Sequence, residues 1–457
     1  MLVKRVPVLY VFFSCFICFL SSFTTGSVCA SELFTGVPLE VFTGEESYFW
    51  ARVERHKDPH PGFVQENFHP EGERNDPILK KWFGNDSTPH SGEFLLHCAE
   101  GYDKRNLQIP VLLIHGASDN ANRAWIHPYI RHKCFQGEIS EIPEKERGFA
   151  YWLSNLGYPV FAVTFAHGQG DNFMQSEQIA DAITRIRQIM KRENDADFKV
   201  SLIAHSKGNI AARLYLSGSR SLFPRKKFLT EYRGDVKTYI AVAPAMRGID
   251  TPFRYYVYNL ALAAEKVAKP VMLNAPIACD RILVYGLWKK TNKNSIFPES
   301  GDNLFPGQCQ LLYNLAEENI VPLGLDSNTS DFNQTMIALY YGGTTAFLSS
   351  RGIEKAIDAG ERLMYKLESK GINPDVSLCV LAGNCPNITY EEDKLTPMPW
   401  EKFTPAGDGL IPLESSTFTD NILNMGANLI EKKILYFNHL DLARHNSLLQ
   451  IIDEWLL

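Results

Sequence analysis

The sequence has no excess of basic residues, and this shortage excludes one class of partner. Lysine and arginine number 46 against 52 aspartate and glutamate residues in a chain of 457, which gives a formal net charge of −6. Proteins that bind nucleic acid concentrate positive charge to meet the phosphates. We therefore expect no nucleic-acid partner.

Long apolar runs are also scarce, and the one at the N-terminus has the layout of a secretory signal peptide. Lys4 and Arg5 precede the apolar run 8–20, and small residues follow up to Ala30. This order of basic, apolar and small segments predicts a signal peptide over 1–30, cleaved near Ala30, and hence a secreted (extracellular or periplasmic) protein. A membrane anchor is the alternative, but the run is short for a span of the bilayer.

After residue 30 the chain has no Cys-x-x-Cys pair, the spacing that structural zinc sites use. Six cysteines remain there, an even number that in an exported protein predicts three disulfides. Cys379 and Cys385 are the first predicted pair, because the five residues between them suit a tight loop; Cys279 with Cys309 is a second suggestion. Cys98 and Cys134 complete the set. No metal site is predicted.

No internal repeat or low-complexity tract is present; instead, short apolar runs alternate with helical periodicity. The predicted strands are 93–98, 109–114, 159–164, 199–204, 237–242, 377–381 and 433–437. Apolar residues at steps of three and four predict helices over 149–156 and 179–190. Such alternation is typical of an α/β fold with a mostly parallel central sheet and helices on both faces.

The chain divides into five predicted parts. They are the signal peptide 1–30, an N-terminal flanking segment 31–105, a first core part 106–247, an inserted cap or lid 248–373, and a second core part 374–457. The insertion contains two aromatic and aliphatic stretches: Phe253, Tyr255, Tyr256, Tyr258, Leu260 and Leu262 in one, and Thr335 to Leu348 in the other. Either these stretches pack on the core or they form an apolar roof over an active site.

Ser206 is the candidate nucleophile. It lies in Ala204-His205-Ser206-Lys207-Gly208, between the apolar run 199–204 and an amphipathic segment. A serine flanked by small residues at a sharp turn from strand to helix projects its hydroxyl above the sheet edge. The pentapeptide alone is of low specificity, and its context and the partners elsewhere in the chain carry the hypothesis.

A serine hydroxyl needs a base to accept its proton and an acid to orient that base. Asp408, between two glycines after the run 377–381, is the candidate acid, with a simple Asp-Gly turn as the alternative. His439 follows the last strand directly and is the candidate base. His445, six residues on and expected within the closing helix, is its rival.

The negative oxygen of a tetrahedral intermediate requires backbone donors. The amide of Lys207, next to the nucleophile, is one candidate. The amide of Ala117 is the second, because it follows the apolar run 109–114 and His115-Gly116. Ser118 could instead be a nucleophile, but no strand-to-helix elbow surrounds it.

These motifs, from Ile114-His115-Gly116 to Asn438-His439-Leu440-Asp441, resemble the α/β-hydrolase superfamily, in particular its secreted lipases and esterases, over residues 94–457. Asp119-Asn120-Ala121 followed by Trp125 is also similar to extracellular polyhydroxyalkanoate depolymerases. The resemblance implies a Ser206–His439–Asp408 triad and no cofactor. Some lipases with a His-Leu-Asp segment bind a structural calcium through that aspartate, so Asp441 is a calcium candidate, with helix capping as the alternative.

The resulting expectation is a secreted carboxylic ester hydrolase that acts through an acyl-enzyme, with a lipase of acylglycerols as the first choice. A polyester depolymerase, a phospholipase and a lipid acyltransferase share the mechanism and remain alternatives. A noncatalytic binding protein on the same scaffold is a third class. The expected partners are a lipid or other ester substrate and, through the cap, a transient lipid interface; the sequence leaves the oligomeric state open.

Overall fold

The computed structural model describes residues 34–66, 76–103, 109–126, 147–254, 288–290, 306–323, 330–344, 348–350, 352–386, 389–391, 394–396 and 405–457. The chain divides into Met1–Leu33 and Phe34–Leu457, and the description concerns the second unit. The predicted signal peptide, Cys134, Cys279 and the stretch from Tyr255 to Leu262 lie outside the described residues. Within those residues, no helix combines the length and apolar character needed to cross a membrane.

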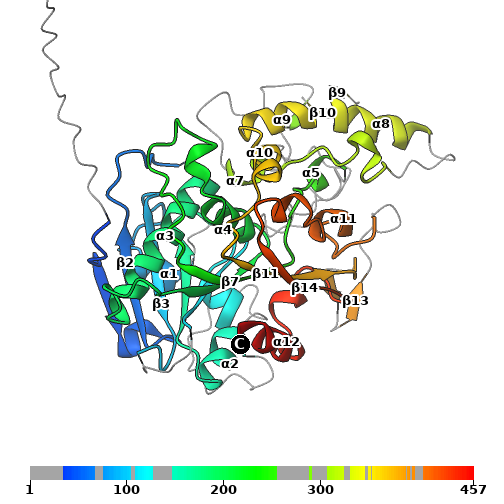
Figure 1. Ribbon diagram of the computed structural model, residues 1–457. Helices are drawn as coiled ribbons and strands as arrows, with labels where there is room; N and C mark the ends of the chain where they lie inside the picture. Colours follow the sequence, from blue (N-terminus) through cyan, green and yellow to red (C-terminus); the bar gives the residue numbers. More distant parts are fainter. Residues whose placement is uncertain are drawn as a thin grey trace, which may run out of the picture. The chain divides into compact units, whose positions relative to one another are not determined.

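Nine strands form the central sheet (Figure 1), in the order β1-β2-β3-β5-β4-β6-β7-β11-β14. The pairing is antiparallel from β1 through β2 and β3 to β5. From β5 onwards it is parallel, through β4, β6, β7 and β11 to β14. The bounds are β1 Glu40–Thr43, β2 Arg52–Lys57, β3 Glu93–Cys98, β4 Val111–Ile114, β5 Val160–Phe165, β6 Val200–His205, β7 Val236–Val242, β11 Ser377–Gly383 and β14 Asn428–Leu435.

Helices cover both faces of this sheet because successive strand side chains point to opposite faces. On one face, Leu113 and Ile203 pack with residues of α1 (Pro77–Trp82), α2 (Phe149–Asn155) and α12 (Leu449–Leu456). On the other, Leu112 and Leu202 pack with α3 (Asn172–Ile189) and α4 (Gly208–Leu216). The predicted α/β fold, mostly parallel with helices on both faces, is confirmed.

Two features of the sheet differ from the sequence prediction. The last strand is Asn428–Leu435, so it begins and ends earlier than the predicted 433–437. Strands β1 and β2 were not predicted at all, because Glu40–Thr43 and Arg52–Lys57 are short and mix charged with apolar residues. They extend the sheet by antiparallel pairing with β3.

The residues between β7 and β11 include several short elements. They are α5 Thr251–Arg254, β8 Trp288–Lys290, α7 Pro306–Cys309, η7 Glu317–Asn319, α8 Ser330–Tyr341, β9 Gly343–Thr344, β10 Leu348–Ser350, α9 Ile353–Ala359 and α10 Leu363–Lys370. Strands β8, β10 and β9 make a small antiparallel sheet. After β11 come the hairpin β12 Thr389–Glu391 with β13 Lys394–Thr396, and the helix α11 Leu413–Ser416. The cap boundaries at 248 and 373 stay a prediction.

The predicted disulfide between Cys379 and Cys385 is wrong. Cys98, Cys379 and Cys385 all carry free thiols, so the prediction of three disulfides is wrong as well. Cys379 lies inside β11, and at about 3.3 Å per residue its Cα is roughly 13 Å from that of Gly383. A disulfide needs Cα atoms about 4.4–6.8 Å apart. The residues taken for a tight loop form an extended, buried strand instead.

Candidate active site

Ser206 occupies the turn between β6 and α4, and its backbone has a φ of 53°. A non-glycine residue in this left-handed region is strained, and such strain persists only where the surroundings hold it. The amide of Ser206 donates to the carbonyl of Val242 at 3.0 Å. A Cβ atom at Gly208 would lie 2.5 Å from the carbonyl oxygen of His115, so only glycine allows this approach of helix and strand.

The structure brings Ser206, His439 and Asp408 together from three distant parts of the chain. His439 Nε2 lies 2.8 Å from Ser206 Oγ, and His439 Nδ1 lies 2.8 Å from Asp408 Oδ2. His439 is 3% exposed and Asp408 is fully buried. This line of hydrogen bonds can take a proton from the hydroxyl and stabilise the resulting imidazolium.

Asp408 is held in place by backbone donors. Its Oδ1 accepts hydrogen bonds from the amides of Leu410 at 3.0 Å and Ile411 at 2.8 Å, and its carbonyl accepts from the amide of His439 at 2.9 Å. Gly383 ends β11 beside it, where a Cβ atom would lie 2.7 Å from the Asp408 Cβ. The glycine thus leaves the room that the carboxylate occupies.

His205 supports the position of His439 from the strand below. Its Nε2 lies 2.9 Å from the carbonyl oxygen of His439, and the two rings lie 5.0 Å apart. Burial, together with the charge of the neighbouring His439, lowers the pKa of His205 to about 3. His205 is therefore neutral at ordinary pH and donates to that carbonyl without adding a second positive charge.

The two candidate oxyanion donors both adjoin the nucleophile. Lys207 is the next residue, and a Cβ atom at Gly116 would lie 2.9 Å from the Ser206 Cβ, so the loop that carries Ala117 passes beside Ser206. The rival residues lie in other settings. Ser118 accepts a hydrogen bond from Gln169, and His445 precedes η11 (Asn446–Leu448), where its Nδ1 lies 2.7 Å from Ser447 Oγ.

Helix α7 of the insertion packs next to the elbow. The amide of Gly307 donates to the Gln169 carbonyl at 3.1 Å, and Gln310 Oε1 accepts from the amide and side chain of Asn172 at 2.8 and 2.9 Å. A Cβ atom at Gly307 would lie 2.2 Å from Lys207 Cε, whose ammonium donates to Gln175. The insertion therefore contacts the residue that directly follows the nucleophile.

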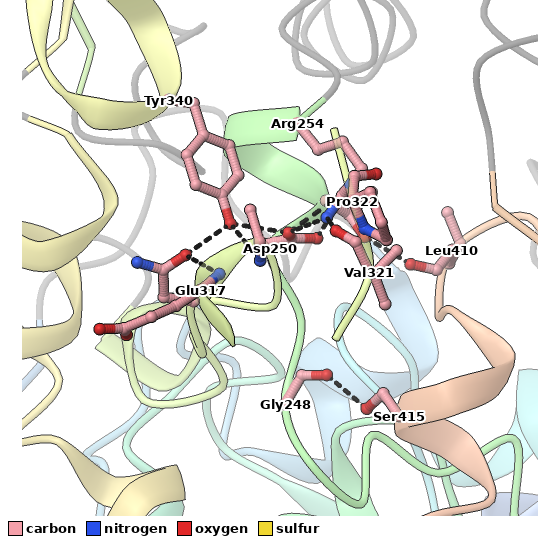
Figure 2. Close-up of polar contacts among 12 residues, drawn as sticks. Gly248, Asp250, Arg254, Glu317, Val321, Pro322, Tyr340, Leu410 and Ser415 are labelled. Carbon is pink, nitrogen blue, oxygen red and sulfur yellow. Dashed lines mark hydrogen bonds and ion pairs between the residues drawn. The ribbon is translucent and has the colours of Figure 1, made fainter. Parts of the chain in front are cut away.

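The insertion is also fastened to the loop of the acid (Figure 2). Ser415 Oγ donates to the carbonyl of Gly248, and Thr251 Oγ1 donates to the carbonyl of Leu410. Behind these contacts, Arg254 forms an ion pair with Asp250 at 2.6 Å. The hydroxyl of Tyr340 donates to the same carboxylate at 2.8 Å. Contacts thus connect the insertion both to the residue after the nucleophile and to the loop that follows Asp408.

Three supporting residues were missed from the sequence. His205 is adjacent to the nucleophile but gives no pattern of its own, and the role of Gly383 depends on a loop 25 residues later. Asn438 Oδ1 accepts from the amides of Leu440 and Asp441 at 3.0 and 2.9 Å and so shapes the turn after His439. Only Asn438 offered a clue, since an asparagine side chain often hydrogen-bonds to the backbone two residues on and so forms a turn.

Residues 108–255 match the model of the family described as lipase (class 2). Solved structures with limited similarity include a mature lipase from Bacillus licheniformis, at 12% identity over 76% of this chain and 92% of that one, with a TM-score of 0.36. A Sulfolobus solfataricus protein that is assigned as a lipase has 13% identity, coverage of 91% of this chain and 98% of that one, and a TM-score of 0.34. An esterase B from Lactobacillus rhamnosis has 12% identity, coverage of 88% and 86%, and a TM-score of 0.35.

These overall superpositions are too loose to carry a conclusion on activity, and no curated protein matches the sequence. The matched segment is more informative, because it begins before β4 and runs through the elbow to α5. The parallel sheet and its helices have the arrangement of the α/β-hydrolase fold, and residues 108–255 are similar to class 2 lipases.

Proposed function

We propose that this chain is a serine hydrolase that cleaves carboxylic esters of lipids, with Ser206, His439 and Asp408 as its catalytic triad. The observation that carries the proposal is the pair of 2.8 Å contacts from the Ser206 hydroxyl through His439 to Asp408. The positive φ of Ser206 adds support, since this strained turn is typical of a nucleophile elbow. The match of residues 108–255 to class 2 lipases supports a lipid ester as substrate.

In the proposed reaction, His439 Nε2 accepts the proton of Ser206 as Oγ attacks the ester carbonyl. Asp408 stabilises the imidazolium, and the amides of Ala117 and Lys207 bind the negative oxygen of the intermediate. His439 then passes the proton to the leaving alcohol, which leaves an acyl-enzyme. Water activated by the same histidine releases the acid and restores Ser206.

In this proposal the insertion forms the site that binds the acyl group. Its contacts with Gln169, Lys207 and the Asp408 loop support a roof that starts directly beside the nucleophile. An apolar roof would bury an acyl chain and would meet a lipid surface transiently. The identity of the acyl group, and transfer to an alcohol in place of water, depend on this part of the chain.

Substitution of Ser206 by alanine tests the proposal. The variant should fold, because alanine and serine adopt the left-handed turn at similar cost. Its kcat on a simple aryl ester should fall by roughly 10⁶-fold. Ser118→Ala is the matched control and should keep its activity. Hydrolysis that survives in the folded Ser206→Ala variant would refute the assignment.

The substrate class requires a separate product analysis. Triglycerides, phospholipids and polyhydroxyalkanoate of graded chain length should be supplied to the wild type and to the Ser206→Ala variant. We expect fatty acid from acylglycerols to be the main product. Release from phospholipid or polyester alone, or ester formation with an added alcohol, would replace the lipase proposal by the corresponding alternative.

Export is part of the same proposal, with cleavage near Ala30. The described free thiols can persist in an oxidising compartment, because Cys98 and Cys379 are buried and burial raises the pKa of Cys379 to about 12. A thiol that stays protonated is a poor partner for disulfide exchange. Sequencing the N-terminus of the protein recovered from its native source should give Ser31; a retained Met1 would contradict export by cleavage.

A further inference from the structure

Three buried carboxylates, none of them from a triad residue, lie close together in the structure. Asp58 directly follows β2, and Glu177 and Asp181 are one turn apart on α3. One oxygen from each lies within 4.8 Å of the others, and the three residues are only 5%, 6% and 4% exposed. We call this group the carboxylate cluster.

Like charges at positions i and i+4 of a helix repel each other, and burial in a medium of low polarity strengthens the repulsion. The electrostatic neighbour of opposite sign is Arg233. Its guanidinium donates to Asp235, to the hydroxyls of Tyr215 and Thr184, and to the Ala180 carbonyl. These hydrogen bonds turn Arg233 towards other acceptors than the cluster.

A second observation points to a missing ligand. Asp181 Oδ2 is fully shielded from solvent, and no donor among the described residues reaches it. A buried carboxylate oxygen without a donor costs several kcal/mol in general, so native proteins pair such atoms with a donor or a cation. Asp58 is a hydrogen-bond partner of the Asp181 side chain, but two carboxylates can satisfy each other only by sharing a proton or by binding a cation.

The other two carboxylates are already oriented by their surroundings. The amide of Thr230 donates to Glu177 Oε2 at 2.6 Å, its hydroxyl donates to Oε1, and the amide of His60 donates to Asp58 Oδ1 at 2.6 Å. Burial raises the pKa of Glu177 to about 7 despite the hydrogen bonds from Thr230. Hydrogen bonds from Thr230 and His60 thus orient two of the three carboxylates, but they bring no positive charge to the cluster.

From this geometry we propose that Asp58, Glu177 and Asp181 bind a calcium ion. Calcium prefers carboxylate oxygens at roughly 2.3–2.6 Å, so two ligands on one ion lie up to about 5 Å apart, which the 4.8 Å spacing satisfies. Water completes the coordination. The ion ties the loop after β2 to the middle of α3, whose first residue, Asn172, donates to the carbonyl of Gly307 in α7. Asp441, the calcium candidate of the sequence, is not in this group.

Calorimetric titration of the full chain with calcium chloride, after removal of divalent ions by a chelator, tests the site. The wild type should bind one calcium ion per chain, and calcium should raise its Tm. Asp181→Asn and Glu177→Gln keep the shape of each side chain but remove a charge, and each should weaken binding by about tenfold or more. Asp375→Asn, at an exposed aspartate, is the matched control and should bind as the wild type does.

The opposite results overturn the proposal. No calcium binding by the folded wild type would mean that the cluster shares a proton instead of a cation. Unchanged affinity in Asp181→Asn would place the ion elsewhere. Circular dichroism checks that each variant is folded, and Glu177→Gln decides the question should Asp181→Asn fail to fold. None of these readouts depends on ester hydrolysis, so failure here leaves the proposed function untouched.

Discussion

Asp408 and the carboxylate cluster are both buried acids, but their surroundings differ in kind. Both oxygens of Asp408 have partners: two backbone amides on Oδ1 and the imidazole of His439 on Oδ2. In the cluster, three carboxylates face one another and Asp181 Oδ2 has no donor among the described residues. A buried acid with its full set of donors is satisfied by the protein alone, whereas a buried acid without them points to a ligand.

The largest expected difference between the two groups is in catalysis. Asp408→Asn should reduce kcat/KM on an aryl ester by about 10⁴-fold, because the amide favours the wrong tautomer of His439 while the fold is kept. Asp181→Asn should retain the turnover of the wild type. Steady-state kinetics on both purified variants measures this difference in kcat/KM. An equal loss of activity in the two variants would contradict the different roles of Asp408 and Asp181.

A third buried acid, Asp250, is paired with a cation but takes no part in the proposed catalysis, so substitutions around it measure the effect of charge pairing on stability alone. It is neutralised by Arg254 at 2.6 Å, and both side chains are buried. Arg254→Ala leaves this carboxylate without its cation and should cost about 3–5 kcal/mol of stability. Tyr340→Phe removes a neutral hydroxyl that donates to Asp250 and accepts from the Ala316 amide, and it should cost about 1–3 kcal/mol. Denaturant unfolding compares them; equal costs would mean that the ion pair contributes no more than the hydroxyl.

A buried base extends the comparison to the opposite charge. Burial lowers the pKa of His97 to about 3 from an ordinary value near 6.5, and its ring lies between Trp50 and Trp82. The unfolded chain therefore binds the proton at higher pH than the folded one, so this contribution to stability is lost as the pH falls from about 6.5 towards 3.

His97→Gln should flatten the dependence of the unfolding free energy on pH by about 1.4 kcal/mol per pH unit between these limits. Denaturant unfolding at pH 4, 5 and 6 gives the slope independently of any overall loss of stability in the variant. His445→Gln, at a partly exposed histidine, is the control and should leave the slope unchanged. A slope that is the same in His97→Gln and the wild type would contradict a neutral, buried His97.

The sequence was sufficient for the parallel strands because their apolar runs are bounded by turn residues. Strands β4, β6 and β7 begin within two residues of their predicted starts. It was insufficient where pairing decides the structure. The polar strand Arg52–Lys57 is defined by its neighbour β3. Cys379 lies in the predicted strand 377–381, but it was paired with Cys385 because the five residues between them suggested a tight loop, whereas the strand continues to Gly383.

The site shows the same division. Ser206, Asp408 and His439 could be proposed because each follows a predicted strand in a recognisable order, and the structure places the three side chains within hydrogen-bonding distance. The carboxylate cluster could not be foreseen, since Asp58 and α3 are far apart in sequence. Helix α3 was identified from Ile179, Ile183 and Ile186, and periodicity gave no reason to expect that its polar side, with Glu177 and Asp181, is buried too.

Reaction of the full chain with an aryl phosphonate, followed by mass spectrometry of its peptides, tests the central claim most directly. A phosphonate forms a stable adduct only with a serine that a neighbouring base activates. We expect one adduct, on Ser206, that forms far more slowly in His439→Ala and not at all in Ser206→Ala. An adduct on Ser118 or another serine, or a folded wild type that stays unlabelled, would contradict it.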